Sequence, residues 1–170
     1  QASKSTPVGS VAQFAAAGKS VKKKDLASIM MSYGYVYVAQ VAMGADMNQC
    51  LKAMHEAESY HGPSIVIAYV INHGIKGGMG VSMNEEKKAV AAGYWHTFRF
   101  DPRRADNGEN PFQLDSKKPS ASYRDFIMGE VRYNSLTRAF PQRAEQLFEK
   151  AEKYAEEKYE KFAHMASEEE

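Results

Sequence analysis

The glycine-rich stretch at residues 74–80 is the first candidate for chemistry in this sequence. It holds four glycines and follows an apolar run at residues 64–70. Such a loop could bind phosphate through its backbone N–H groups. Its glycine spacing matches neither the dinucleotide-binding fingerprint nor the P-loop, so a tight loop without a ligand is the stronger interpretation. His73 stands after the same run, where ligands bind in open α/β sheets, although a lone loop histidine is more often structural.

Other residue types that ligate metals or act as nucleophiles are scattered. The single cysteine, Cys50, falls on the apolar side of a predicted helix and is interpreted as a small buried hydrophobic residue. The remaining histidines have no cysteine or carboxylate at metal-ligand spacing, and they are His55, His61, His96 and His164. We therefore predict no metal site among these residues.

Positive charge gathers in two clusters. Arg99, Arg103 and Arg104 surround Asp101 and could bind a carboxylate or phosphate, but they could equally hold a long loop to a sheet, which we favour. The second cluster consists of lysines, at positions 19 and 22–24. No aromatic residues are interleaved with these lysines, as a single-strand nucleic-acid groove requires, so the cluster is interpreted as solvated surface.

The bulk composition indicates one ordinary globular domain. The chain has 170 residues, 44% of them hydrophobic and 25% charged, and its 22 Lys and Arg nearly balance 21 Asp and Glu. This balance argues against partners recognised by charge alone, such as nucleic acid or an anionic membrane surface. No apolar run approaches the roughly 18 residues of a membrane span. A single cysteine forms no intrachain disulfide, which favours a reducing, cytoplasmic location.

Strand and helix patterns alternate along the chain. β-branched and aromatic residues predict strands at residues 35–41, 64–70 and 96–100, parallel to one another. The second is a continuous apolar run, typical of a strand buried on both faces. Helices are predicted to begin near Asp25, Asp46, Ser82 and Ser122, and a long final helix at Pro141. Residues 101–119 are predicted to be irregular, and residues 11–17 to form a short helical turn.

This alternation predicts an α/β fold with a mostly parallel sheet, flanking helices and a long C-terminal helix. We expect residues 1–166 to form one domain and residues 167–170 to be a frayed tail. One side of the helix after Asp46 is apolar and is expected to face the core; its residues are Met47, Cys50, Leu51, Met54 and Ala57. Taken alone, these patterns support only a site at the strand ends.

Seven short segments, taken in chain order, match a known family. They are Gln1-Ala-Ser-Lys-Ser-Thr-Pro7, Tyr33-Gly-Tyr-Val-Tyr-Val-Ala39, Gly62-Pro-Ser64, Ile71-Asn-His-Gly74, Arg99-Phe-Asp-Pro-Arg103, Asn110-Pro-Phe-Gln-Leu-Asp-Ser-Lys117 and Glu130-Val-Arg-Tyr133. The segments that begin at Arg99 and Asn110 are the most specific. From Gln1 to about Phe162, the chain resembles the pyruvate:ferredoxin (flavodoxin) oxidoreductases, as the C-terminal part of their thiamine-diphosphate-binding domain.

The resemblance implies a function for a larger protein. Enzymes of this family decarboxylate pyruvate on thiamine diphosphate and Mg²⁺, transfer the acetyl group to coenzyme A, and pass electrons through [4Fe–4S] clusters to ferredoxin or flavodoxin. The cofactor carries the chemistry, and the protein orients it. By this resemblance, the chain would work with the remaining domains of the same enzyme as a cytoplasmic homo-oligomer, without nucleic acid or membrane partners.

The resemblance also assigns site residues. Gln1, Ser3 and Lys4 belong to the cofactor-binding loop. The Gly-Asp-Gly segment that holds Mg²⁺ and diphosphate, and the catalytic asparagine, are expected before Gln1. We therefore expect no catalytic residue and no metal ligand within the chain, and no activity from the chain alone. The strand-end loop near the cluster comprises Ile71, Asn72, His73 and Gly74.

The strand-end loop departs from the family pattern. The family carries Tyr-x-x-Cys-Ile-Asn-His-Gly, and its cysteine ligates the cluster nearest the thiamine. This chain has Tyr69-Val-Ile-Asn-His-Gly74, which is two residues shorter and lacks the cysteine. Because such clusters need thiolates, and because Cys50 lies on a helix elsewhere, the chain as written does not supply this ligand. Either two residues are truly deleted, or the sequence omits two residues of the natural protein.

Three hypotheses follow from these observations. The chain is a portion of the oxidoreductase, or a scaffold module that has lost its cluster ligand, or part of a different thiamine enzyme such as a non-oxidative decarboxylase. The match at residues 110–117 argues against the third. Gly-Asp-Gly and Cys-x-x-Cys sequences upstream in the gene would support the first, and an in-frame start near Gln1 would support the second.

Overall fold

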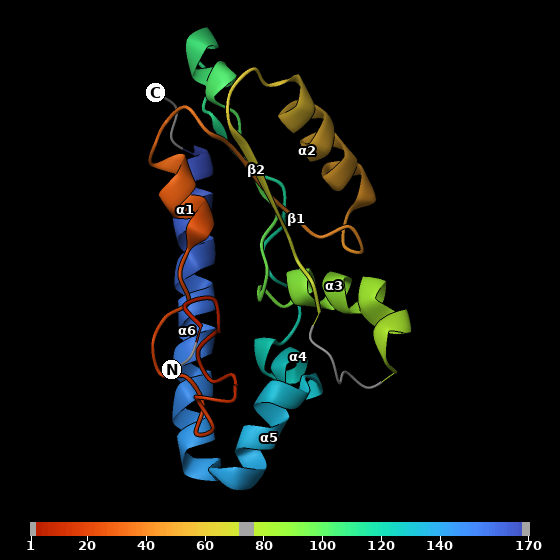
Figure 1. The fold of residues 1–170 in the computed structure, drawn as a ribbon, viewed down its shortest axis with the longest axis vertical. Helices are drawn as coiled ribbons and strands as arrows, with labels where there is room; N and C mark the ends of the chain where they lie inside the picture. Colours follow the sequence, from red (N-terminus) through yellow and green to blue (C-terminus); the bar gives the residue numbers. More distant parts are fainter. Residues whose placement is uncertain (1–2, 72–76, 168–170) are drawn as a thin grey trace.

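A mixed four-stranded sheet forms the centre of the fold. The computed structural model describes residues 3–71 and 77–167 (Figure 1). The strands lie in the order β2-β1-β3-β4. Their bounds are Tyr37–Val41 for β1, Ser64–Ala68 for β2, Phe98–Phe100 for β3 and Phe112–Leu114 for β4. The predicted α/β class is confirmed, with flanking helices and a long C-terminal helix.

The third strand does not run as predicted. β2 pairs parallel with β1, but β3 pairs antiparallel with both β1 and β4. The segment before β3 lies at the carboxyl end of β1, since Trp95 donates its indole N–H to the Val41 carbonyl at 3.1 Å. β3 therefore begins where β1 ends, and no crossover returns the chain to the other end of the sheet. The expectation of three parallel strands was wrong for this reason.

The second strand lies at the edge of the sheet. β2 has β1 as its only neighbour among the described strands. Its central residues are half-buried and its two end residues are exposed, so the prediction of burial on both faces was wrong. A continuous apolar run indicates what the strand can bury, and the sheet order decides what it does bury.

Six α-helices surround the sheet in the described residues. They are α1 (Leu26–Met31), α2 (Met47–Ser59), α3 (Ser82–Ala91), α4 (Tyr123–Gly129), α5 (Val131–Ala139) and α6 (Pro141–Ser167), with short 3-10 segments η1 (Met79–Val81) and η2 (Pro102–Asn107). Asp25 and Asp46 cap α1 and α2 as predicted, and Ser122 caps α4; each side chain accepts a bond from a backbone N–H. Among these helices, none has the length and apolar content that a membrane span needs.

Several predicted boundaries differ from the structure. Residues 11–17 form turns rather than a helical turn. The stretch predicted to be irregular contains η2 and β4, and α5 was not predicted. The predicted tail lies mostly outside the described residues, apart from Ser167, which still belongs to α6.

Helices cover both faces of the sheet (Figure 1). On one face, Val38 and Phe98 pack with Ala27 of α1 and Phe162 of α6. On the other face, Tyr37, Ala39 and Val41 pack against Ala53 of α2. A third core lies beyond the sheet, where α3 to α6 enclose Trp95, Phe126, Tyr133, Leu136 and Phe148.

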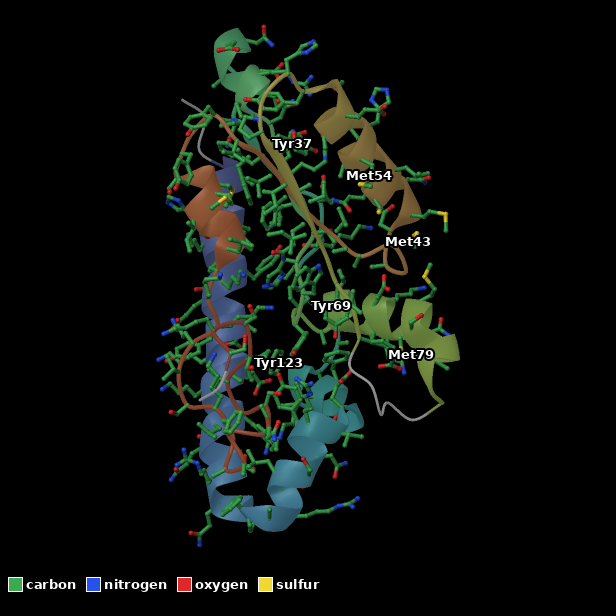
Figure 2. All side chains as sticks on the ribbon, in the orientation of Figure 1. Tyr37, Met43, Met54, Tyr69, Met79 and Tyr123 are labelled. Atoms are coloured by element: carbon green, nitrogen blue, oxygen red, sulfur yellow. The ribbon has the colours of Figure 1, made fainter. Side chains whose placement is uncertain are left out.

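Only part of the apolar side predicted for α2 faces the sheet, since Cys50 and Ala57 pack against the core around Tyr37 and the methionines and leucine of that side do not. Gln49 and Ala53 are its buried residues, whereas Met47, Leu51 and Met54 are 53%, 63% and 55% exposed. Figure 2 shows Met43 and Met79 on the side of the molecule away from α6. The small side chain of Ala53 allows close contact with β1, which larger residues at the same position would prevent. Helical spacing identified an apolar side correctly but did not show that Met47, Leu51 and Met54 on this side remain uncovered.

Candidate functional site

A cavity of about 810 Å³ lies between the N-terminal segment, the sheet and α6. Figure 2 labels two of its lining residues, Tyr69 after β2 and Tyr123 at the start of α4. The other walls come from residues 3–8 and 22–27, from β1 at Gln40, from residues 93–96, and from α6 between Ala151 and Lys161. This volume falls within the roughly 300–1,000 Å³ typical of small-molecule sites.

Lys19 holds the N-terminal segment over this cavity. Its ammonium donates to three backbone carbonyls, those of Ser3 at 2.8 Å, Lys4 at 3.3 Å and Thr6 at 2.6 Å. The side chain is buried, so the interpretation of Lys19 as solvated surface was wrong. These bonds fix the course of residues 3–6 because each uses one of the three ammonium donors.

The structure describes two of the three residues that were predicted to bind the cofactor. Ser3 lines the cavity, and Lys4 lies beside it with an exposed side chain and a carbonyl bound to Lys19. Gln1 lies outside the described residues. The structure thus brings Ser3 to the same cavity as the end of β2, as the prediction of a site at the strand ends requires.

Of the predicted strand-end loop, only its first residue is described. Ile71 is buried and directly follows Tyr69 and Val70, which both line the cavity. Asn72, His73 and Gly74 lie outside the described residues, so their predicted role near a cluster stays a prediction, and so does the phosphate interpretation of the glycine-rich stretch.

Cationic side chains dominate the polar lining. Six of them line the cavity, against the two carboxylates of Asp25 and Glu157; the cations are Lys22, Lys23, Lys24, Arg132, Lys158 and Lys161. Lys22 pairs with Glu157 at 3.2 Å, and Lys158 pairs with Asp25 at 3.4 Å. The lining therefore keeps an excess of positive charge, and the sequence interpretation of residues 22–24 as plain solvated surface was incomplete.

Lys23 stands at the rim of the cavity. Its ammonium lies 5.4 Å from the ring centroid of Trp95. The residue is exposed overall, yet desolvation of the ammonium by the surrounding protein, followed by repulsion from Lys158, lowers its pKa. An anion placed between Lys23 and Lys158 would relieve that repulsion.

His96 is the most deeply buried titratable residue of the lining, at 2% exposure. Neither ring nitrogen has a hydrogen-bond partner in the described part of the chain, although the Ala155 backbone lies close enough to favour protonation. Burial, and then the charge of Lys158, lower the pKa of His96 to about 4. His96 is therefore neutral near pH 7, with one nitrogen able to donate and the other to accept.

Aromatic rings form the opposite wall. Tyr69 packs against Tyr94 and Trp95 with centroids 6.1 and 5.3 Å apart, and Tyr94 packs against Tyr123 at 5.9 Å. Burial raises the pKa of Tyr94 to about 12, and its hydroxyl lies 3.0 Å from that of Tyr133. These phenols stay protonated at neutral pH, so the wall offers stacking surface and hydrogen-bond donors, but no phenolate.

Cys50 takes no part in this cavity. It lies on α2, half-buried beside the core that contains Tyr37 and Ala39. Burial, and then the charge of Glu86, raise the pKa of the thiol, so it is a poor nucleophile and ligand. Within residues 3–71 and 77–167, no group of three or more His, Cys, Asp or Glu side chains could hold a metal ion. The donors that a [4Fe–4S] cluster requires do not fit these residues.

The arginine cluster is structural, as we favoured. Arg99 bonds to Asp115 and Glu56, and Arg103 bonds to Asp101 with Nη2 to Oδ2 at 2.6 Å. The third member, Arg104, donates from Nε to the Asn110 carbonyl at 2.8 Å. The Arg99 bonds join β3 to α2 and to the segment after β4, and the other two arginines brace the segment between β3 and β4 from within.

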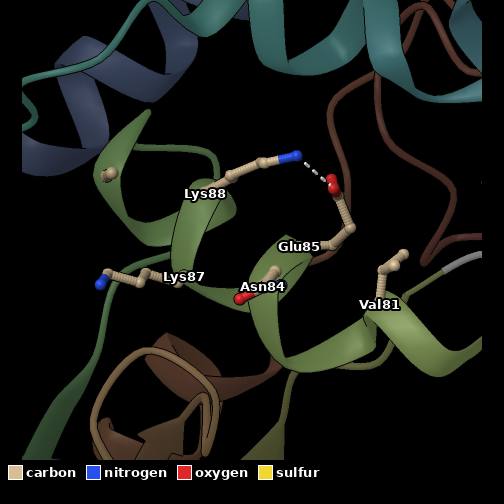
Figure 3. Close-up of a pocket in the computed structure, with 6 residues that line it drawn as sticks. Val81, Asn84, Glu85, Lys87 and Lys88 are labelled. Atoms are coloured by element: carbon tan, nitrogen blue, oxygen red, sulfur yellow. Dashed lines mark hydrogen bonds and ion pairs between the residues drawn. The ribbon is translucent and has the colours of Figure 1, made fainter. Parts of the chain in front are cut away.

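A second pocket lies on the outer surface of α3. Figure 3 shows its lining, which comes only from η1 and α3. Its one ion pair joins Lys88 to Glu85 at 2.5 Å, with the lysine largely exposed. A pocket formed by one helix surface does not enclose a ligand, so the larger cavity is the stronger candidate.

Sequence reasoning did not place His96, Lys23 and Lys158 in the lining of one cavity. They come from three separate segments, and no local spacing connects them. One signal was present: Lys158 lies one turn before Phe162, close to the apolar side of a helix. A cation in that position lies beside a core rather than on a fully solvated face.

Comparison with known proteins supplies the family. No protein-family model matches the chain. It is 57% identical over 168 residues to the pyruvate:ferredoxin oxidoreductase of Moorella thermoacetica, which covers 98% of this chain and 14% of that protein. It is 54% identical to the pyruvate-flavodoxin oxidoreductase of Klebsiella pneumoniae, over 99% of this chain and 15% of that protein.

A mitochondrial pyruvate dehydrogenase [NADP(+)] of Euglena gracilis is 48% identical over 149 residues, covering 86% of this chain and 8% of that protein. The chain thus spans about one seventh or less of the length of these relatives. By sequence, it belongs to the family of pyruvate:ferredoxin and pyruvate-flavodoxin oxidoreductases and corresponds to one segment of them.

Proposed function

We propose that the chain forms the C-terminal part of a thiamine-diphosphate-binding domain in an enzyme that oxidatively decarboxylates pyruvate. The products would be acetyl-CoA, formed with coenzyme A, and electrons passed to ferredoxin or flavodoxin. The observation that carries this proposal is the 57% identity over 98% of the chain. The partners of the chain would be the remaining domains of the same enzyme. The whole enzyme would be a cytoplasmic homo-oligomer.

The cavity gives the chain a role in holding the cofactor. When bound, thiamine diphosphate with Mg²⁺ supplies the carbanion chemistry. Ser3, Ser5 and Thr6 line the cavity on the N-terminal segment, where polar groups can orient a ligand. Lys19 fixes this segment through three carbonyls, so its hydroxyls are held in place rather than free to move. Within the described residues, the chain would orient the cofactor, and no group of three or more His, Cys, Asp or Glu side chains is gathered to hold a metal ion.

Calorimetry on the chain alone tests this division of roles. With Mg²⁺ present, we expect residues 1–170 to bind thiamine diphosphate no tighter than millimolar, because the described residues hold no group of carboxylates for the metal. Pyruvate oxidation by the chain alone should be undetectable. Binding at micromolar affinity would contradict the proposal that the cofactor is held mainly by other segments.

A chimera tests the function itself. The matched segment of the Moorella thermoacetica enzyme is replaced by this chain, either as written or with Ala-Cys inserted between Val70 and Ile71. We expect pyruvate-dependent reduction of ferredoxin only with the inserted cysteine, because clusters require thiolates. The matched control inserts Ala-Ala, which restores the length but not the ligand. Inactivity of all three folded chimeras would refute the proposal.

The lack of a cysteine between Tyr69 and Ile71 favours a second function. Among the described residues, Cys50 is the one cysteine, and it lies on α2 outside the cavity. A domain that has lost its cluster ligand could serve as a scaffold that docks on a partner. The gene decides between the two: a native reading frame that encodes a cysteine between Tyr69 and Ile71 excludes the scaffold, and a frame without it supports the scaffold.

A further inference from the structure

Five methionines and one leucine form an exposed apolar face on the outer side of the molecule. All nine methionines of the chain lie in the described residues, and five of them are exposed. The exposed ones all belong to the loop after β1, to α2, or to η1 and α3, and the other four are buried or half-buried. This methionine face consists of Met43, Met47, Leu51, Met54, Met79 and Met83, with exposed fractions from 38% to 63%.

The segments of this face meet where α2 and α3 begin. A Cβ atom on Gly44 would lie 2.2 Å from the backbone oxygen of Met83, so the loop after β1 touches the first turn of α3. Met43 stands directly before this contact. Met79 stands four residues before Met83, on η1, which leads without a break into α3. Figure 2 shows Met43 and Met79 on the side of the molecule away from α6.

Helix α2 extends the face along the same side of the molecule (Figure 1). Met47, Leu51 and Met54 stand four and three residues apart, so they lie on one side of the helix. Each of them is more than half exposed, whereas Ala53 is fully buried against β1. The core of the chain therefore does not cover these three side chains.

Such a face indicates a contact with another protein surface. Large contiguous patches of exposed apolar side chains are rare on proteins that work alone, and they mark interaction sites. Methionine is enriched in protein–protein interfaces, and its flexible, polarisable side chain adapts to the shape of a partner. A single exposed leucine would need no explanation, but all the exposed methionines of the chain gather in one region.

We propose that this methionine face is covered, in the whole enzyme, by an apolar surface of the polypeptide outside these 170 residues. The matched segment is 14% of the Moorella thermoacetica enzyme, so most of that protein lies outside it. A surface on the same polypeptide meets the face at a high effective concentration, which favours it over a second copy of the chain. The covering surface must be apolar opposite Leu51, because burying an unpaired charge there is costly.

This inference rests on the proposed function in one respect, namely that the remaining domains of the enzyme are the partners of the chain. It adds the surface through which they bind. It does not depend on the reaction, so its test needs no pyruvate oxidation. A folded but inactive chimera with a covered methionine face would contradict the proposed function alone. An active chimera with an open face would contradict this inference alone.

Oxidation by hydrogen peroxide tests the cover on the full-length chimera with Ala-Cys inserted. Peptide mass spectrometry follows the sulfoxide at each methionine, and a short methionine peptide in the same sample gives the rate of a free side chain. We expect all five methionines of the face to react at least about tenfold more slowly than this peptide, because a covered side chain reacts only when the contact opens. In the 170-residue chain, the same five should react at nearly the rate of the peptide.

The control for this measurement is Met31, which is 8% exposed and should react slowly in any folded form of the chain. Two results would overturn the proposal. One is a rate near that of the peptide at the five methionines of the full-length chimera while Met31 stays slow. The other is equal protection of the five methionines in the 170-residue chain, since the cover would then come from the chain itself.

A charge at the centre of the face identifies what covers it. In the same chimera, Leu51→Asp should raise the oxidation rates of Met47 and Met54 at least about tenfold, because a buried, unpaired carboxylate opens the contact. The number of subunits, measured by light scattering, should not change. The matched control is Val131→Asp, since Val131 is 51% exposed on α5 and lies outside the face. This control should leave both rates unchanged.

Two results of this second test would also overturn the proposal. Separation of the subunits by Leu51→Asp would identify a second copy of the enzyme as the covering surface. Equal rises in the oxidation rates for Leu51→Asp and Val131→Asp would show a general loosening of the fold rather than the loss of one contact.

Discussion

Arg99 holds Asp115 through two hydrogen bonds, from Nε to Oδ2 at 3.0 Å and from Nη2 to Oδ1 at 2.8 Å. Its Nη1 also donates to Glu56 of α2 at 2.7 Å. The guanidinium is buried at 5% exposure, and these two carboxylates keep its pKa above the usual value despite desolvation. One side chain thus joins β3, the segment after β4 and α2.

Replacing Arg99 should destabilise the chain strongly. In Arg99→Met, the carboxylates of Asp115 and Glu56 remain, largely buried and without their main partner. We expect a loss of about 3–5 kcal/mol in the free energy of unfolding, measured by urea denaturation. The control is Arg104→Met, since Arg104 pairs with the exposed Glu109 at 2.9 Å and should cost at most about 1 kcal/mol. Equal losses for both variants would contradict the role given to Arg99.

Gly44 allows the loop after β1 to contact α3. A Cβ atom at this position would lie 2.2 Å from the backbone oxygen of Met83, and the Gly44 N–H donates to Glu86 at 2.8 Å. Gly44→Ala must therefore shift the backbone of α3, and we expect a loss of about 1–3 kcal/mol. The matched control is Gly80→Ala, where no atom lies within 4 Å and φ is not positive. The thermal midpoints of the two variants should separate clearly, and a fall in both would disprove the contact.

The fold class could be predicted because local patterns determine it. Asp25, Asp46 and Pro141 begin helices in the structure as their chemistry predicts. Strand direction could not be predicted, because alternation of elements says nothing about the end of the sheet at which a strand begins. β4 also escaped prediction, since three residues show too little periodicity. Order in the sheet is a tertiary property, and it decided the exposure of β2.

The site could be predicted only in part, for the same reason. Ser3 followed from the resemblance, and the end of β2 from the rule on strand ends. His96 and the lysines of the cavity meet through tertiary packing, and Lys22 pairs with Glu157 across 135 positions of sequence. A cluster of lysines in sequence indicates surface on average, but Lys19 is buried because three carbonyls accept from it.

The outer side of α2 should tolerate polar residues. Leu51 is 63% exposed, so Leu51→Ser should change the free energy of unfolding by no more than about 0.5 kcal/mol. Ala53, two positions later, is fully buried against β1, and Ala53→Leu should cost about 1–3 kcal/mol by overpacking. Urea denaturation of both variants gives the comparison. If Leu51→Ser proved the more costly change, the side of α2 that faces the sheet would be the one that helical spacing first suggested.

His96 should make stability depend on pH. Its pKa is about 4 in the folded chain, against an ordinary value of 6.5, because burial and Lys158 disfavour the charged ring. Between these values, the unfolded chain binds more protons, so stability falls as the pH falls from about 6.5 to 4 and the effect levels off below that range. The full effect is roughly 3 kcal/mol, because a tenfold difference in proton affinity between the folded and unfolded chain corresponds to about 1.4 kcal/mol.

The variant His96→Phe isolates this effect from that of the carboxylates. Phenylalanine keeps the ring contacts with Tyr159 and Phe162 and cannot bind a proton. We expect the stability of the variant, relative to the wild type, to rise as the pH falls from 6.5 to 4.5, measured by urea denaturation in chloride buffer. The exposed control, His55→Gln, should follow the wild-type curve. Parallel curves for the wild type and His96→Phe would show that His96 takes up protons equally in both states. In that case, the inference that His96 is uncharged in the folded chain would be wrong.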